Sequence, residues 1–498
     1  MQRKHGVIIG YINFFILNIS TFFLTPLMIY VWGTEEFGIY KLVMTLTGFF
    51  MLLDFGISNS IIRFVSEYKE KNEKINERKF LGLILMLFGI MVCVLLIGSY
   101  LVSFEFHSIY KALSNEQVIL AKNLFLLLIF NASILLFSNI FQSILKAYEK
   151  YIFLNAFLFF KNLIRFGAVY CLLLKNVNTY TIVAVDIILN AIFLVLIILF
   201  VFIKLKIRFQ FFKIEKMFIS NVFSYSIFIF IEMIAFQFFW STDLILLGIF
   251  STANAIAVYS IGVFFTSSFE SMSGIISGVT MPRIINISSK KNHDEEFFKE
   301  IVKIARIKMF ILSIPLIGFI FIGKDLITLW VGLEFLDAYY IAVIVMIPQY
   351  FSRVQDVLSQ VMWAKNRQKQ KALISSIAAF INIAITIFLI QEIGIIGAAI
   401  GTAIAFTVGY LIGEGSYVHR KLGINIFLLY KKVYSSAVLS FFIIGVFSYL
   451  LMIFTNLSWK VLSLKIIIFL MIYSSIIWLL ALNKDEKKII KSFFKFLN

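Results

Sequence analysis

Apolar stretches long enough to cross a bilayer recur from one end of this sequence to the other. Of its 498 residues, 61% are hydrophobic and only 14% are charged, whereas soluble domains average about 25% charged residues. A bilayer core needs about 20 apolar residues of helix, and in lipid only helices or closed barrels satisfy the backbone. We therefore expect an all-α polytopic membrane protein. About fourteen transmembrane helices are predicted, near residues 7–31, 37–65, 80–103, 119–145, 152–174, 182–204, 219–250, 255–283, 306–330, 338–363, 372–390, 394–418, 435–455 and 461–482.

The net charge of +18 is distributed in a way that predicts the topology. Lysine and arginine gather in alternate loops, such as 66–79 and 283–308, while the intervening loops hold few. Basic loops mark the cytoplasmic side of a membrane protein, so both termini are predicted to be cytoplasmic. The same distribution argues against nucleic acid as a partner, because the basic residues lie in short loops between apolar segments.

No loop is long enough for a soluble domain, so any chemistry must take place in the membrane. The basic tail alternates lysines with apolar residues, which fits an amphipathic helix on the inner leaflet; a solvated charged tail is the alternative. We predict an N-terminal lobe of six spans at 1–204, a cytoplasmic linker at 205–218, a second six-span lobe at 219–418, two further spans within 419–482, and the tail at 483–498.

Weak internal similarity relates the two lobes. Tyr40 precedes Arg63 by 23 residues, and Tyr259 precedes Arg283 by 24, and each arginine is followed by a lysine-containing loop. Six is an even number of spans, so both lobes begin on the same side of the membrane. This is the arrangement that a parallel repeat, related by a pseudo-two-fold axis, requires.

Three segments resemble a known family. They are TPLMIYVWGTEEFGIYKLVMTLTGFFMLLDFGISNSIIRFVSEY at 25–68, TDLILLGIFSTANAIAVYSIG at 242–262 and GIIGAAIGTAIA at 394–405. They are similar to the polysaccharide-biosynthesis flippases, the O-antigen and capsule repeat-unit translocases of the multidrug/oligosaccharidyl-lipid/polysaccharide exporter superfamily. The resemblance covers most of the chain, but its motifs are shared with lipid II flippases and drug exporters.

The resemblance implies two six-helix lobes around a central cavity that opens alternately to either side. It implies an oligosaccharide linked through diphosphate to undecaprenol as cargo, movement coupled to an ion gradient (H⁺ or Na⁺), and a place in the bacterial inner membrane. A polymerase and other polysaccharide-assembly proteins are the expected partners. Lipid II flippases carry arginines in the first span, whereas here that span has no charge after Lys4 and His5, which weakens the lipid II alternative.

Cations inside spans are the first candidates for the binding of an anionic cargo. An intramembrane charge is expensive and usually serves function. Lys161 and Arg165 lie four residues apart near the midplane and share one face of the fifth span; binding of diphosphate and pairing with an acid on a neighbouring span are both open. Arg353 is a candidate at the inner gate, and Arg63 either contacts cargo or snorkels to headgroups. Lys41 lies near an outer end, where snorkelling is commoner.

Acidic residues inside spans are candidates for ion coupling. They are Glu232, Glu270, Asp54 and Asp356. A salt bridge from either glutamate to Lys161 or Arg165 is the alternative. Asp356 lies three residues from Arg353 and so has the spacing to pair with it on one helix face.

Polar and helix-kinking residues of the first span are further candidates. We expect Asn13, Asn18 and Pro26 to line the cavity, with the proline providing a kink; polar contact between helices is the commoner use of such asparagines. There is no Walker motif, Gly-rich phosphate loop or Cys/His metal cluster in the sequence. We therefore predict neither an enzyme nor a bound cofactor.

A flippase for lipid-linked oligosaccharide is the function that these features favour. A drug or cation exporter on the same scaffold is the main alternative, and it would need an acidic cavity to dominate over a basic one. A membrane-embedded glycan polymerase is a further alternative, which the short outer loops disfavour.

Overall fold

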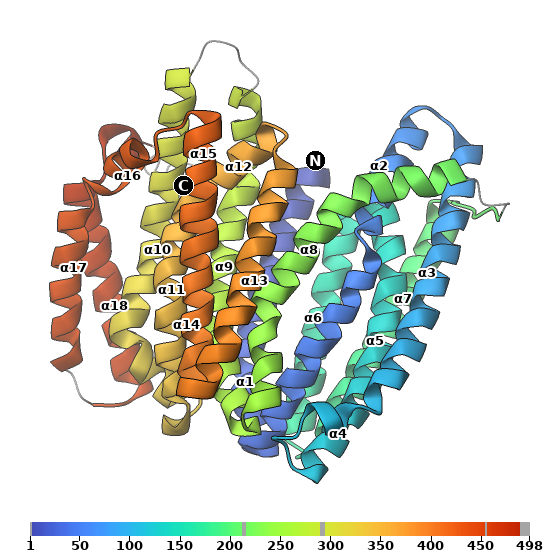
Figure 1. Ribbon diagram of the computed structural model, residues 1–498, viewed down its shortest axis with the longest axis horizontal. Coiled ribbons are helices and arrows are strands. Elements are labelled where there is room, and N and C mark those ends of the chain that lie inside the picture. Colours follow the sequence, from blue (N-terminus) through green and yellow to red (C-terminus); the bar gives the residue numbers. More distant parts are fainter. Residues whose placement is uncertain (1, 212–215, 289–293, 454–455, 489–498) are drawn as a thin grey trace. The chain divides into compact units, whose positions relative to one another are not determined.

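The computed structural model describes residues 2–211, 216–288, 294–453 and 456–488 and forms two compact units, 1–260 and 261–498. Every regular element in the described ranges is helical (Figure 1). Unit 1 contains α1 (Gln2–Phe50), the 3₁₀ turn η1 (Met51–Asp54), α2 (Ile57–Glu70), α3 (Lys74–Ser103), α4 (Phe106–Ile109), α5 (Asn115–Ala147), α6 (Tyr151–Leu173), α7 (Thr179–Leu199), the π-helical η2 (Phe200–Lys204), α8 (Lys216–Phe250) and the start of α9 (Ala253–Ser288).

Unit 2 begins within α9 and holds the remaining helices. They are α10 (Asp294–Trp330), η3 (Leu333–Phe335), α11 (Asp337–Gln355), α12 (Val357–Ala364), α13 (Gln368–Ile393), α14 (Ile395–Ala405), the π-helical η4 (Phe406–Glu414), α15 (Gly415–Leu422), α16 (Ile426–Tyr434), α17 (Val438–Leu450), η5 (Leu451–Ile453), α18 (Trp459–Ile476) and the π-helical η6 (Ile477–Ala481).

The helical, polytopic architecture predicted from the sequence is confirmed. Within the described residues, 12 helical segments are long and apolar enough to span a membrane, and a bent pair, Ile426–Tyr434 with Val438–Ile453, makes a thirteenth. The segment Phe15–Glu70 is 56 residues long, far more than the ~20 that one crossing needs. It therefore covers most of the first predicted span and all of the second, which brings the number close to the fourteen expected.

A glycine turn separates these two spans. Gly33 adopts φ 77° and ψ 170° within α1, a conformation that is strained for any residue with a Cβ atom. Pro26 lies inside the helix, and the non-helical dihedral angles are those of Gly33. The kink expected at Pro26 stays a prediction.

Close packing after this turn positions the second half of α1. A Cβ atom on Gly38 would lie 2.1 Å from the Ala253 carbonyl oxygen at the start of α9, so only glycine permits this approach. Two residues later Tyr40 packs its ring against Trp32 at a centroid distance of 5.4 Å. The backbone on either side of Gly38 is thus fixed, and with it the start of the helix face that carries Lys41.

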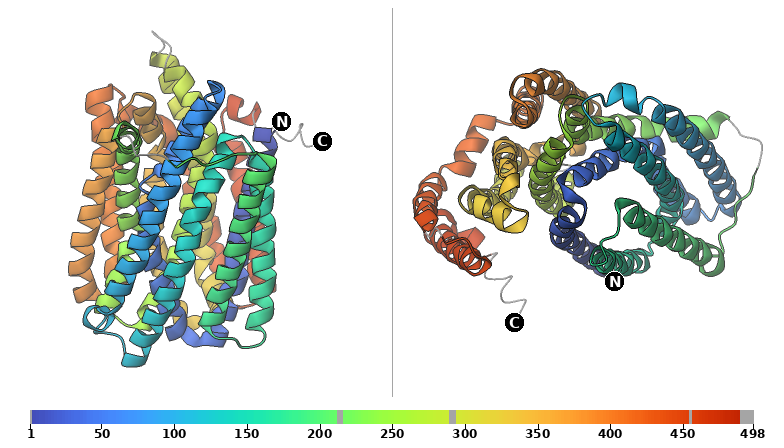
Figure 2. Two further views of the ribbon diagram at one scale, coloured as in Figure 1. Left: turned by 90° about the vertical axis from the view of Figure 1, so that its right-hand side faces the viewer. Right: turned by 90° about the horizontal axis from the view of Figure 1, so that it is seen from below.

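Unit 1 is organised around α1 and α5. Helix α1 packs against α6, α5 and α8, and α5 packs against α7 and α3 (Figure 2). Helix α8 also packs against α2, so it belongs to unit 1, whereas the predicted second lobe begins with this span. The lobes predicted at 1–204 and 219–418 stay a prediction, and most of the predicted tail, 489–498, lies outside the described residues.

In unit 2 the last helices are attached to α10 by polar contacts at three positions. The Arg306 guanidinium donates to both carboxylate oxygens of Glu486, at 2.6 and 2.9 Å, and to the Ala481 carbonyl at 3.0 Å. The Tyr473 hydroxyl donates to the Phe310 carbonyl at 2.6 Å. Farther along α10, Asp325 pairs with Lys465 at 2.5 Å.

Candidate cationic cavity in unit 1

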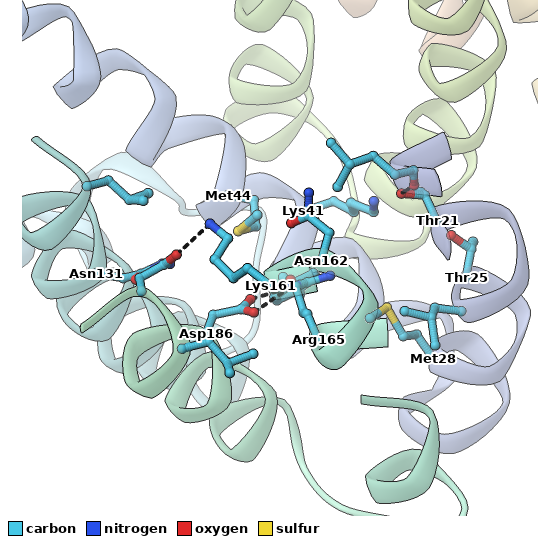
Figure 3. Close-up of a pocket in the computed structure, with 16 residues that line it drawn as sticks. Thr21, Thr25, Met28, Lys41, Met44, Asn131, Lys161, Asn162, Arg165 and Asp186 are labelled. Carbon is cyan, nitrogen blue, oxygen red and sulfur yellow. Dashed lines mark hydrogen bonds and ion pairs between the residues drawn. The ribbon is translucent and has the colours of Figure 1, made fainter. Parts of the chain in front are cut away.

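A cavity of about 370 Å³ lies inside unit 1, between α1, α5, α6 and α7 (Figure 3). Each wall is one face of a helix, because its residues recur at intervals of three and four. The lining residues are Leu17, Thr21, Leu24, Thr25, Met28, Tyr40, Lys41 and Met44 of α1, Asn131 and Leu135 of α5, Lys161, Asn162 and Arg165 of α6, and Asp186, Leu189 and Asn190 of α7.

Arg165 is held by an acid on the neighbouring helix. Its Nε atom lies 2.5 Å from Asp186 Oδ1 and a terminal nitrogen lies 2.8 Å from Oδ2. This planar, two-bond pairing is the geometry that arginine forms best with a carboxylate. Pairing with an acid on a neighbouring span, one of the two possibilities left open for Arg165 by the sequence, is present with Asp186 as the partner.

Lys161 is held by amides instead. Its Nζ atom donates to Asn190 Oδ1 at 3.0 Å, and Asn190 in turn donates to Asn131 Oδ1 at 2.9 Å. The ammonium also lies 4.8 Å from the centroid of the Phe193 ring, within range of a cation–π interaction. These contacts fix the position of the ammonium without neutralising its charge.

Lys41 is the third cation of this cavity. Its ammonium lies 5.2 Å from the Phe37 ring centroid, and it has no ion pair within the part of the chain that the structure describes. The cavity lining therefore holds three positive side chains, Lys41, Lys161 and Arg165, and one negative side chain, Asp186. Three minus one leaves two positive charges. We call this site the cationic cavity.

The first span supplies the less polar wall. Leu17, Thr21, Leu24 and Met28 follow one face of α1, and the Thr21 hydroxyl donates to the Leu17 carbonyl of its own helix at 2.9 Å. Asn13 does not line the cavity, but it accepts a hydrogen bond of 2.7 Å from the lining residue Asn162. Asn18 and Pro26 are not among the lining residues.

The predicted site residues of unit 2 form a separate group. Arg353 on α11 pairs with Glu270 on α9 at 2.5 Å, and Gln349 donates to the same glutamate oxygen at 3.0 Å. The Arg353 guanidinium also lies 5.4 Å from the Phe406 ring centroid. Arg353 therefore takes a partner on another helix instead of Asp356.

Asp356 lies where α11 meets α12 and takes Lys308 of α10 as its partner. Lys308 Nζ lies 2.7 Å from Asp356 Oδ2 and 2.6 Å from the Ser277 hydroxyl oxygen. The lysine side chain is 0% exposed. We call Glu270, Lys308, Arg353 and Asp356 the paired cluster, because each charge in it has an opposite charge within 2.7 Å.

The three remaining candidates are not among the cavity-lining residues. Asp54 is buried at a break in the second span, where Phe55 and Gly56 have φ values of 49° and 71°. It accepts a hydrogen bond of 2.6 Å from the Ser58 hydroxyl and so stabilises the start of α2. Glu232 is half-buried on α8. Arg63 is exposed, 5.5 Å from the Phe64 ring centroid.

Sequence reasoning missed most of the lining of the cationic cavity, including Asn131, Asn162, Asp186 and Asn190. Asp186 carries the same signal as Arg165, a charge inside an apolar span, and on that ground could have been included. Lys41 was placed near an outer end, but its side chain lines the cavity. Among the described residues no group of three or more His, Cys, Asp or Glu side chains is placed to hold a metal ion.

The fold is similar to those of membrane transporters of known structure. The lipid II flippase MurJ, in an inward closed conformation, superposes with a TM-score of 0.74 at 19% identity, over 94% of this chain and 98% of that one. An inward-facing multidrug resistance MATE transporter of the MOP superfamily superposes with a TM-score of 0.64 at 15% identity, over 83% and 96% of the two chains.

Sequence comparisons give the family. A curated relative, the probable low-salt glycan biosynthesis flippase Agl15 of Haloferax volcanii, is 23% identical over 193 residues; the match spans 39% of this chain and 40% of that relative. The profile of the family described as "Polysaccharide biosynthesis protein" matches residues 6–288. This range includes all of unit 1 from residue 6 onward and every residue of the cationic cavity. The chain belongs to this family of polysaccharide biosynthesis proteins.

Proposed function

We propose that this protein is an alternating-access flippase that moves an oligosaccharide, linked through diphosphate to a polyprenol, from the cytoplasmic to the outer leaflet for surface polysaccharide synthesis. The observation that carries the proposal is the cationic cavity, in which three cations face one carboxylate. An exporter of cationic drugs would need the opposite balance, because a net positive cavity repels its cargo.

The cavity offers the chemistry that such a cargo needs. An anionic linkage crossing the bilayer must exchange water for fixed donors, because an unpaired charge in hydrocarbon is costly. Lys41 and Lys161 supply ammonium donors. Asn131, Asn162 and Asn190 supply amides able to donate to and accept from sugar hydroxyls. The leucines and Met28 of α1 form an apolar wall beside them.

The setting of this transport is part of the proposal. The protein lies in the bacterial inner membrane with both termini in the cytoplasm, and an H⁺ or Na⁺ gradient drives its cycle. It carries no cofactor and performs no covalent chemistry, so the glycolipid leaves as it entered. A polymerase and other polysaccharide-assembly proteins then act on the delivered glycolipid.

Reconstitution in liposomes tests the proposal. Transfer of a polyprenyl-diphosphate oligosaccharide between leaflets is measured for wild type, Lys161→Met and Lys161→Ala/Arg165→Ala, each checked for folding by size-exclusion chromatography. We expect transfer by wild type, a decrease of about ten-fold or more in the single variant, since a hydrogen bond to a charged group contributes ~1.5–3 kcal/mol, and loss in the double variant.

Lys122→Ala is the matched control. Lys122 lies on α5, also in unit 1, with its ammonium 4.9 Å from the Phe104 ring centroid, and it does not line the cavity. It should transfer cargo at the wild-type rate. If folded wild type moves none of a panel of polyprenyl-diphosphate glycans but extrudes organic cations, the exporter alternative replaces this proposal. Appearance of longer glycans during the assay would favour a polymerase.

A further inference from the structure

The charges of the cationic cavity are unequally matched. Arg165 already faces both oxygens of Asp186, at 2.5 and 2.8 Å, and the Asp186 side chain is only 10% exposed. Lys161 faces an amide oxygen, and Lys41 faces an aromatic ring. The uncompensated positive charge of the cavity therefore resides on the two lysines, one from α1 and one from α6.

Two uncompensated charges match one class of anion. In a diphosphate diester, each phosphorus atom carries one ionised oxygen, so the linkage between lipid and sugar has two negative charges. A lipid linked to sugar through a single phosphate diester has one. Inside a protein the attraction between charges is stronger than in water, so an unmatched lysine left beside a monoanion is unfavourable.

We infer that the cationic cavity selects a diphosphate linkage over a monophosphate linkage by charge balance, with Lys41 and Asp186 as the residues that set the balance. This inference rests on the proposed function. Lys41 supplies the second open positive charge. Asp186 keeps the third cation, Arg165, occupied, so that the cavity presents two charges and not three.

The inference predicts opposite effects for two substitutions. Each charge in the cavity interacts with both charges of a diphosphate but with only one charge of a monophosphate. Removing the positive charge of Lys41 should therefore lower the preference for diphosphate. Removing the negative charge of Asp186 should raise it. A variant that only perturbs folding would weaken binding of both lipids. It would not lower the preference for diphosphate at one site and raise it at the other.

The experiment measures binding of two lipids that differ only in the linkage. Wild type, Lys41→Met and Asp186→Asn are placed in nanodiscs and titrated with polyprenyl-diphosphate-N-acetylglucosamine and with polyprenyl-phosphate-N-acetylglucosamine. The quantity of interest is the ratio of the two dissociation constants. We expect wild type to prefer the diphosphate by about ten-fold or more, as for one additional hydrogen bond to a charged group.

Lys41→Met should reduce this ratio toward one, and Asp186→Asn should increase it by a similar factor. Asparagine is isosteric with aspartate, so the site keeps its shape, and Asp186→Glu should restore the wild-type ratio. Lys122→Met is the control and should leave the ratio unchanged. Equal ratios in wild type, Lys41→Met and Asp186→Asn would overturn the inference while leaving the flippase proposal intact. Absence of binding of either lipid to folded wild type would instead contradict the proposed function.

Discussion

The two units place similar charged residues in opposite situations. In the cationic cavity of unit 1, three cations share one carboxylate and line open space. In the paired cluster of unit 2, Arg353 faces Glu270 and Lys308 faces Asp356, at 2.5 and 2.7 Å. A charge that is fully paired and buried holds helices together, whereas a charge with only neutral partners is available for a ligand. A position inside the membrane does not by itself show whether a charge holds helices together or binds a ligand.

The largest effect on stability should come from breaking the paired cluster. Lys308→Met removes a side chain that is 0% exposed and leaves Asp356 without its cation. Breaking a buried pair in this way costs about 3–5 kcal/mol of unfolding free energy. We expect Lys308→Met to unfold at a clearly lower temperature than wild type in the same detergent.

Two further variants make this test specific. Lys308→Met/Asp356→Asn removes both charges and should recover part of the lost stability. Lys161→Met, in the cationic cavity, removes a cation bonded to an amide and should cost only ~1–3 kcal/mol. Equal thermal stability of Lys308→Met and Lys161→Met would mean that the two sites do not differ as described.

The second prediction concerns a substitution that gives Lys161 a carboxylate partner, as each cation of the paired cluster has. Asn190→Asp places a carboxylate where the amide oxygen lies 3.0 Å from Lys161 Nζ. Asn131 can flip its amide and donate to this new carboxylate. The net charge of the lining then falls from two positive charges to one. We expect the flipping rate to fall about ten-fold or more, with thermal stability unchanged or increased.

The control for this prediction is Asn190→Leu, which removes the amide without adding a charge. If both variants lose transport equally, the amide contacts matter and the charge balance does not. If Asn190→Asp retains the wild-type rate of lipid-linked oligosaccharide transfer, Lys161 does not contact the anionic linkage.

Sequence periodicity predicted most of the fold because membrane helices have to be long, apolar and continuous. It also placed Lys161 and Arg165 on one helix face, as the structure has them. It did not identify the break after Asp54. Gly56 permits the left-handed conformation that it adopts, but glycine is also frequent inside regular membrane helices, and Phe55 gives no signal of its own.

The partner of a charged residue is harder to predict from sequence than its depth in the membrane. Hydropathy fixes how deep a residue lies but not which neighbouring helix it faces. The 3-residue spacing of Arg353 and Asp356 suggested a pair within one helix, yet each bonds to a different helix. Likewise Lys41 has the position of a snorkelling anchor, but the close approach of Gly38 to Ala253 fixes the α1 backbone just before it. Such contacts depend on packing between segments far apart in sequence.

The smallest predicted effects are those of removing one hydroxyl group from each unit, at Ser277 and at Thr21. The Ser277 hydroxyl bonds both Lys308 and Asp356, at 2.6 and 2.7 Å, but these two charges also bond each other. Ser277→Ala should therefore cost only about 1 kcal/mol of unfolding free energy and leave transport unchanged. Thr21 in the cationic cavity bonds the backbone of its own helix, so Thr21→Val should hardly affect stability.

Transport should respond in the opposite way to these two variants. Thr21 lines the cationic cavity, and its hydroxyl oxygen can accept a hydrogen bond from the polar part of the cargo. Thr21→Val should therefore lower the flipping rate by a few-fold, as expected for the loss of one neutral hydrogen bond of ~0.5–1.5 kcal/mol. Thermal unfolding and liposome transfer are measured on the same preparations of both variants. A loss of transport in Ser277→Ala without loss of stability would move the paired cluster from a structural role to one in the transport cycle, because a purely structural contact cannot change rate while stability stays constant.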